Sequence, residues 1–223
     1  MHRIADDFEI DGFLCRNGFD TAEARSEARD RLEAAKLTRP GKSRIHRSKV
    51  DTVNQLLLDS VYRVCNDGEC LEMAKELAQG RTVVHVSSQC CQVCRGSDNC
   101  RDVTRLNLCL EKRGKRNVII VGGTPTEHRE IGNLSAGGPV KYRFIDATAG
   151  NYDKKRVKAQ SRQADMVIVW GSTPLPHKVS NIYKDVVPSG RRLSVARRGI
   201  SQMCREIIQA LPDAANRAPN RKK

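Results

Sequence analysis

Short apolar runs alternate with helical patterns through the second half of the chain. The first run, residues 117–121, contains four consecutive β-branched residues and ends abruptly at Gly122 and Gly123. A continuous apolar run of this length is typical of a strand buried on both faces, and the two glycines suit a tight turn into a helix. Further strands are predicted at 140–145, 165–170 and 192–195, with helices at 99–113, 153–164, 179–185 and 200–211. This alternation predicts a small α/β domain with a parallel sheet.

The first half of the chain shows helical rather than strand periodicity. Apolar residues recur at helical spacing over residues 21–36 and again over 49–64, and the connecting segment 37–49 is broken by Pro40 and Gly41 and rich in basic residues. Two helices joined by a basic turn resemble a DNA-reading unit in outline. The simpler interpretation is an ordinary helical hairpin with a charged, solvated connection. Beyond it, a short helix is expected at 71–79 and a strand at 81–87.

The charge of the chain favours an anionic partner. Its 223 residues carry a formal net charge of +14, with a sequence pI of about 9.6, while aromatic residues make up only 4%. Nucleic acid is the partner that this balance favours, with an acidic membrane or a nucleotide phosphate as lesser options. No apolar run approaches the roughly 20 residues needed to cross a bilayer. The amino terminus does not look like a secretion signal, so we expect a cytoplasmic protein without membrane contact.

Nine cysteines, an odd number, gather mainly in the middle of the chain. Without a secretion signal, such a cluster favours metal ligation over disulfides. A C-x4-C pair and a C-x2-C pair provide four thiolates that can surround one zinc ion tetrahedrally: Cys65, Cys70, Cys91 and Cys94. Four protein ligands indicate a structural zinc, and Cys90 or Cys100 could replace one of them. The alternative is that the cysteines are free and buried, which is what we expect of Cys15, Cys109 and Cys204.

Glycine and hydroxyl residues follow the first and third predicted strands of the α/β domain. In a doubly wound sheet these two turns can lie side by side, and backbone N–H groups there can hold a phosphate or another anion. The candidate ligand-binding residues are Gly122, Gly123, Thr124, Gly171, Ser172, Thr173, His177, Lys178 and Arg198. His177 could act as a general acid or base, or simply cap its helix. No set of catalytic residues stands out, so whether the chain is an enzyme stays open.

The predicted helix at 153–164 is strongly basic. Its candidate nucleic-acid contacts are Lys154, Lys155, Arg156, Lys158 and Arg162. Such a row suits a phosphate backbone, although runs of charge more often mean a solvated helix face.

Residues 115–211 resemble an uncharacterised bacterial family of small Rossmann-like domains. The shared motifs fall at Val121-Gly122-Gly123, at His177 with Lys184, and at Arg198, Gly199 and Ser201. The resemblance implies a fold more than an activity.

The sequence therefore predicts an α/β protein: a small parallel-sheet Rossmann-like C-terminal domain preceded by a helical, zinc-binding N-terminal region. We expect a helical region at 1–64, a zinc-knuckle module at 65–98, the Rossmann-like domain at 99–211, and a disordered basic tail at 212–223. The function we expect is that of a zinc-stabilised nucleic-acid-binding or regulatory protein with a phosphate-binding domain. The alternative is a nucleotide-binding sensor or a nucleotide-handling enzyme. The number of subunits is not predicted.

Overall fold

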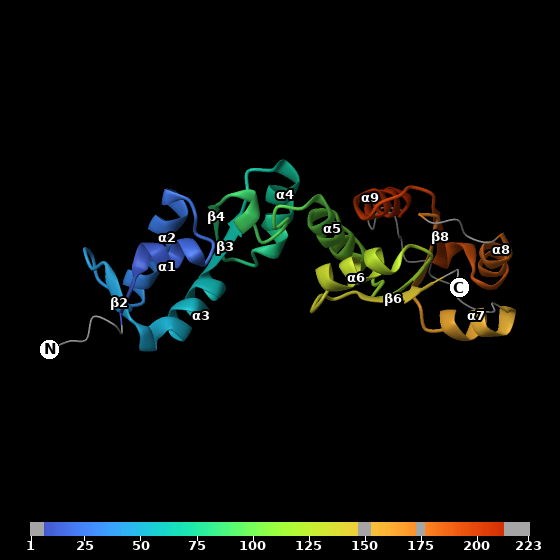
Figure 1. Cartoon of the computed structure of the whole chain (residues 1–223), viewed down its shortest axis with the longest axis horizontal. Coiled ribbons are helices and arrows are strands. Elements are labelled where there is room, and N and C mark those ends of the chain that lie inside the picture. The colour runs from blue at the N-terminus through green and yellow to red at the C-terminus, as the bar shows by residue number, and fades with distance from the viewer. Residues whose placement is uncertain (1–6, 147–152, 173–176, 212–223) are drawn as a thin grey trace, which may run out of the picture. The chain divides into compact units, whose positions relative to one another are not determined.

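The computed structural model describes residues 7–146, 153–172 and 177–211 (Figure 1). The chain forms two compact units, Met1–Ser97 and Asp98–Lys223. The expected helical region at 1–64 and all but the last residue of the expected zinc-knuckle module at 65–98 belong to the first unit. The expected tail at 212–223 lies outside the described residues. In the described ranges, no helix is long and apolar enough to cross a membrane.

The first unit combines helices with two small sheets. Its elements are β1 (Asp7–Glu9), α1 (Ile10–Arg16), α2 (Ala22–Ala34), β2 (Arg44–His46), the 3-10 turn η2 (Arg47–Lys49), α3 (Val50–Ser60), β3 (Val61–Val64), α4 (Gly68–Leu77), β4 (Thr82–His85) and the 3-10 turn η3 (Ser88–Cys90). Strands β1 and β2 pair antiparallel, so the basic connection expected at 37–49 carries a strand. Neither β1 nor α1 was predicted.

The core of the first unit lies among its first three helices and the sheet β3–β4. Ala24, Ala28 and Leu32 of α2 are fully buried against Val53 and Leu57 of α3. The predicted helix at 49–64 is wrong beyond Ser60, because residues 61–64 form strand β3. This strand pairs in parallel with β4, with Val61 opposite Thr82 and Val64 opposite His85. Together with α4 the two strands make a β–α–β unit.

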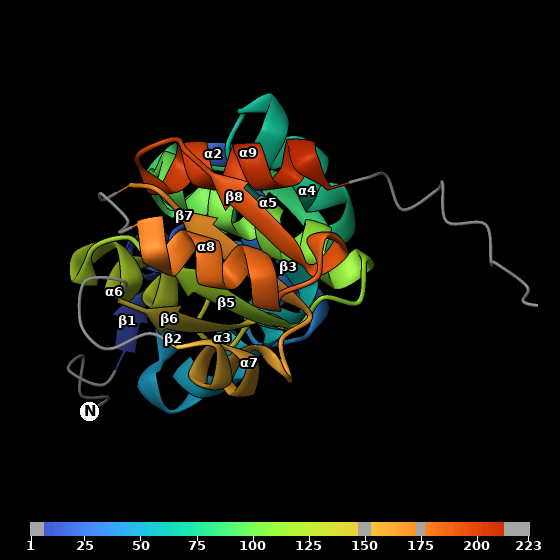
Figure 2. The same cartoon turned by 90° about the vertical axis from the view of Figure 1, so that its right-hand side faces the viewer.

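The second unit is built on a four-stranded parallel sheet, as predicted. Its elements are α5 (Asp98–Lys112), β5 (Asn117–Val121), α6 (Pro125–Leu134), β6 (Lys141–Ile145), α7 (Lys154–Ser161), β7 (Met166–Trp170), α8 (His177–Val186), the 3-10 turn η4 (Ser189–Arg191), β8 (Arg192–Val195) and α9 (Ile200–Ala210). The strand order is β6-β5-β7-β8, and each neighbouring pair is parallel. Figure 2 looks onto this sheet from the side of α7 and α8.

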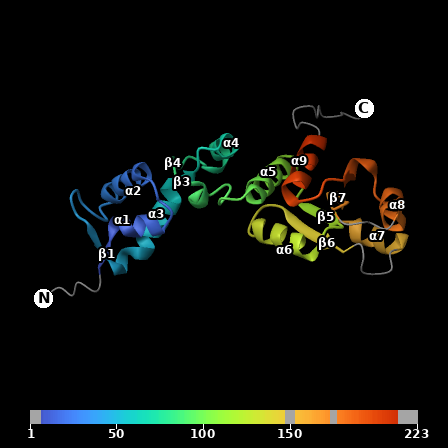
Figure 3. The same ribbon diagram turned by 45° about the horizontal axis from the view of Figure 1, so that its top comes forward.

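Helices cover both faces of this sheet. Alternate residues of β5 explain why: Val118 and Ile120 join the core beneath α5, α6 and α9, whereas Ile119 and Val121 join the core beneath α7 and α8. Figure 3 shows these two groups of helices on opposite sides of the strands. A strand buried on both faces must be apolar throughout, which is the pattern of residues 117–121.

Asp165, which directly precedes β7, connects the amino-terminal ends of β5 and β7 through hydrogen bonds. Its carboxylate accepts the backbone N–H groups of Asn117 (2.8 Å) and Arg116 (2.9 Å), and these bonds lower its pKa. We expect Asp165→Ala to lower the free energy of unfolding by about 1–2 kcal/mol near pH 7. Since a carboxylate with a lowered pKa stabilises the fold above its unfolded pKa, the difference between variant and wild type should vanish as pH falls through the lowered value. Urea denaturation at several pH values measures it, and a difference independent of pH would contradict this role.

Candidate functional site

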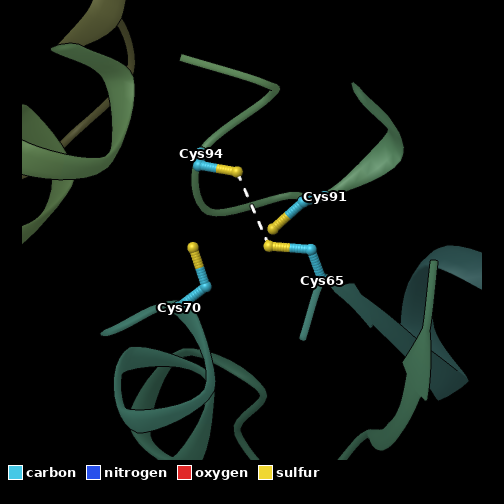
Figure 4. Close-up of side chains that lie close together, drawn as sticks. All are labelled: Cys65, Cys70, Cys91 and Cys94. Atoms are coloured by element: carbon cyan, nitrogen blue, oxygen red, sulfur yellow. Dashed lines mark hydrogen bonds between the residues drawn. The ribbon is translucent and has the colours of Figure 1, made fainter. Parts of the chain in front are cut away.

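Four thiols meet in the first unit. The sulfur atoms of Cys65, Cys70, Cys91 and Cys94 all lie within 4.8 Å of one another, and the four residues are buried (Figure 4). The sulfurs of Cys65 and Cys94 are 3.8 Å apart. A tetrahedral zinc ion with bonds of about 2.3 Å to sulfur places its ligands about 3.8 Å from one another. The donor set and its spacing therefore fit a metal ion such as zinc.

Local backbone structure brings each thiol to this point. Cys65 directly follows β3, and Cys70 lies in the first turn of α4, whose N-cap Asp67 accepts the backbone N–H of Cys70 (3.1 Å). Cys91 and Cys94 belong to a tight turn closed by the bond from the Arg95 N–H to the Cys91 carbonyl (3.0 Å). In that turn Arg95 and Gly96 have φ angles of 48° and 73°, which reverse the chain around the thiols.

Burial and backbone hydrogen bonds act on the thiols in opposite directions. Burial raises the pKa of Cys70, and it raises that of Cys94 to about 11. Burial also acts to raise the pKa of Cys91, but the backbone N–H groups of Cys94, Cys65 and Val93 outweigh it and lower this pKa. Backbone N–H groups directed at sulfur stabilise thiolate, which is the form that binds metal.

The other cysteines lie outside the cluster. Cys90 is half-buried next to Cys91. Cys100, in the first turn of α5, belongs to the second unit, as do Cys109 and Cys204, and all three are buried. The four clustered residues are thus the ones that the spacing of the two pairs predicted, and neither Cys90 nor Cys100 takes the place of one of them. Cys15 is exposed, so the expectation that it is buried was wrong.

A second candidate region lies where β5 and β7 end in the second unit. These strands are neighbours, but α6 after β5 and α8 after β7 pack on opposite faces of the sheet. Ligands of open α/β sheets bind at such a switch point. Gly122, Gly123 and Thr124 follow β5, while Gly171 and Ser172 follow β7. The hydroxyl of Ser172 donates to the Glu127 carboxylate (3.0 Å), so the two turns lie side by side.

The hydrogen-bond donors of the turn after β5 already have an acceptor in the protein, the carboxylate of Glu127. The Glu127 side chain accepts the backbone N–H of Thr124 (2.7 Å) and its hydroxyl (3.0 Å), forming a capping box at the start of α6. His128 bonds to the carbonyl of Gly122 (2.7 Å), and the buried Trp170 lies against Gly123. An added phosphate would compete with Glu127 for the same donors, because both are anions.

The meeting point of the turns at residues 122–124 and 171–172 is here named the crevice, and four further residues were predicted to bind a ligand there. Thr173 lies outside the described residues, as does the side chain of His177, which begins α8. Lys178 and Arg198 are exposed. Within the described part of the chain, no hydrogen bond or ion pair connects either of them to the two turns.

The basic residues predicted on α7 are all exposed: Lys154, Lys155, Arg156, Lys158 and Arg162. Lys154 forms an ion pair with Asp185 of α8 (2.9 Å). Lys155, Lys158 and Arg162 line a hollow of about 530 Å³ together with Arg191. A neighbouring hollow of about 320 Å³ shares Arg162 and Arg191 and adds Arg113, Lys115 and Asp165.

Several residues of these regions were not predicted. Glu127 could have been found, since Thr124 followed by glutamate three residues later is the signature of a capping box. Trp170 and Arg191 carry no comparable signal, because their positions depend on packing between distant segments.

Comparison of the chain with protein-family models, with curated proteins and with solved structures finds no match. The resemblance noted in the sequence is therefore supported at the level of the fold, a parallel α/β sheet consistent with a Rossmann-like domain, and the family is not identified.

Proposed function

We propose that the chain is a zinc-stabilised nucleic-acid-binding or regulatory protein whose second unit contacts a phosphate backbone. The observation that carries this proposal is the pair of adjoining hollows beside α7, here named the basic groove. Lys155, Lys158, Arg162 and Arg191 line its larger part, where none of the described lining residues is acidic. Clustered cations without carboxylates supply sequence-independent affinity for nucleic acid.

One cation of the groove, Arg191, is held in place by hydrogen bonds. Arg191, the last residue of η4, donates to the carbonyls of Ser161 (2.7 Å), where α7 ends, and of Ala164, so its guanidinium is fixed against the end of that helix. Carbonyl partners leave its positive charge uncompensated. Arginine fixed in this way binds phosphate with less loss of side-chain entropy than a free surface side chain.

The ion pairs and lining residues of the groove determine which cations to replace in a binding test. Because Lys154 is paired with Asp185, reversal of Lys155, Lys158 and Arg162 to glutamate probes the groove most directly. We expect this triple variant to bind unrelated duplex or single-stranded oligonucleotides about tenfold or more weakly near 50 mM salt, with a salt slope reduced by about 2–3. Fluorescence polarisation across a salt series measures both quantities.

The matched control reverses three exposed cations that do not line the groove or the hollow next to it, Arg129, Arg197 and Arg198. It changes the net charge by the same amount and should retain most of the affinity. Equal losses in the two variants would show a general charge effect and remove the groove from the proposal.

The second candidate function is that of a nucleotide-binding sensor or a nucleotide-handling enzyme, and the meeting of the two glycine turns favours it. In that case a nucleotide should raise the melting temperature of the protein, and Ser172→Ala should reduce the shift. Glu127→Gln removes the competing negative charge, so it should strengthen binding if phosphate occupies this crevice. We place this function second because Glu127 already accepts the Thr124 N–H.

A further inference from the structure

Four arginines converge on a hollow of about 650 Å³ in the first unit, here named the arginine pocket. They come from distant parts of the sequence: Arg16 ends α1, Arg63 lies in β3, Arg81 precedes β4, and Arg95 belongs to the cysteine turn. Among the lining residues, all of which are described, none carries a carboxylate. The pocket belongs entirely to Met1–Ser97 and shares no lining residue with the basic groove.

Two of these guanidinium groups are held against aromatic rings. Arg63 lies 5.1 Å from the ring centre of Phe19, and Arg81 lies 4.7 Å from that of Tyr62. Arg81 also donates to the carbonyls of Leu77 (2.7 Å) and Ala78 (2.8 Å). Stacking and carbonyl bonds restrict the side chains without neutralising them.

The four positive charges have no counter-ion within the first unit's described residues. None of the four arginines forms an ion pair there, although Asp20 and the Cys90 thiol act on Arg63 at longer range. Burial lowers the pKa of Arg63, which shows that part of its hydration is lost. Holding unpaired cations together and partly dehydrated costs free energy, and an anion placed among them removes that cost.

The cysteine turn forms one wall of the arginine pocket. Gln92 and Arg95 line it from this turn, and Gln89 lines it from η3, just before the turn. Gln92 joins the wall to β3, since its side chain accepts the Arg63 N–H (2.7 Å) and its own N–H donates to the Arg63 carbonyl (3.0 Å). Cys65 lies two residues after Arg63 in the chain. A metal that held Cys91 and Cys94 against Cys65 would therefore also hold this wall of the pocket close to Arg63.

We propose that the arginine pocket is a phosphate-binding site whose shape depends on metal at the four-cysteine cluster. The phosphate could be a diester of a nucleic-acid strand or the terminal group of a nucleotide, since the same guanidinium chemistry recognises both. The site uses none of the residues of the basic groove, so it stands whether or not that groove binds nucleic acid.

The test reverses the two exposed arginines, Arg16→Glu with Arg95→Glu, in the full chain. The matched control is Arg39→Glu with Arg47→Glu, two exposed residues of the same unit that do not line the pocket. Calorimetric titration uses three probes: inorganic phosphate, a nucleoside monophosphate, and an oligonucleotide without terminal phosphates. Circular dichroism establishes that each variant is folded, and Arg16→Gln with Arg95→Gln serves if charge reversal disturbs the fold.

Wild type should bind at least one probe, and the pocket variant should bind it about tenfold or more weakly, as expected when two charge-assisted bonds are lost, while the control stays near wild type. The probe that binds identifies the source of the phosphate. Equal affinities of the pocket and control variants, or no binding of any probe by wild type, would overturn the site. The triple variant of the basic groove is titrated in parallel, so that loss at one site is distinguished from loss at the other.

The metal dependence has its own measurement. Protein stripped with a chelator and freed of it by gel filtration should lose phosphate binding and regain it when zinc is returned. Unchanged phosphate affinity in the stripped protein would refute the dependence on metal and leave the site itself standing.

Discussion

Cys94→Ser is expected to abolish stoichiometric zinc binding and to unfold the end of the first unit. Structural zinc sites contribute apparent binding free energies of about 10–16 kcal/mol, so the loss of one of four thiolates should lower stability by at least about 3 kcal/mol. Burial raises the pKa of Cys94 and Cys70, so protons compete with metal and the affinity should fall as pH is lowered. Metal analysis of protein purified without a histidine tag, together with thermal unfolding, measures the effect.

Cys90→Ser is the matched control for this variant. Cys90 adjoins Cys91 in sequence but lies outside the group of four clustered sulfurs. We expect this variant to retain one zinc ion per chain. Zinc retained by Cys94→Ser, or lost from Cys90→Ser, would show that the ligand set differs from the cluster.

Gly123→Ala should strongly destabilise the second unit. A Cβ atom on Gly123 would lie 2.7 Å from the nearest ring carbon of Trp170, which is fully buried and cannot easily move away. Gly123 also has a φ of 86°, where alanine is strained. Overpacking and backbone strain together should lower the free energy of unfolding by about 3 kcal/mol or more.

Gly137→Ala separates the two causes. Gly137 has a similar φ of 74°, but nothing lies within 4 Å of the position of its Cβ. Its replacement should therefore cost only the backbone strain, about 1 kcal/mol. Trp170 is the single tryptophan of the chain, so its fluorescence follows the unfolding of this unit in urea. Equal destabilisation by both variants would show that Trp170 tolerates the added methyl group.

The parts of the fold set by local patterns were predictable. The strands predicted at 117–121 and 165–170 are found as β5 and β7, because apolar runs such as 118–121 and 166–170 suit central parallel strands that are buried on both faces. The cysteine cluster was likewise predictable from the spacing of its two pairs. The helix predicted at 49–64 was wrong beyond Ser60, since Val61 and Val64 satisfy helical spacing while their strand is stabilised by a partner some twenty residues away.

The arginine pocket illustrates what local patterns do not contain. Arg16, Arg63, Arg81 and Arg95 are separated by up to 79 residues, and only the folding of the first unit brings them together. Each one alone is an ordinary surface cation. The crevice of the second unit is an exception, because the position of its two turns followed from the strand pattern and the Glu127 carboxylate could have been found from its capping-box spacing to Thr124.

The Glu127 carboxylate links ligand binding at the two glycine turns to the capping of α6, because it accepts both the Ser172 hydroxyl and the Thr124 N–H. A molecule that takes the Thr124 N–H must displace the Glu127 carboxylate, and this breaks the capping box at the first turn of α6. Occupancy of the crevice would then be visible as faster amide hydrogen exchange at the start of that helix, before any reaction is sought.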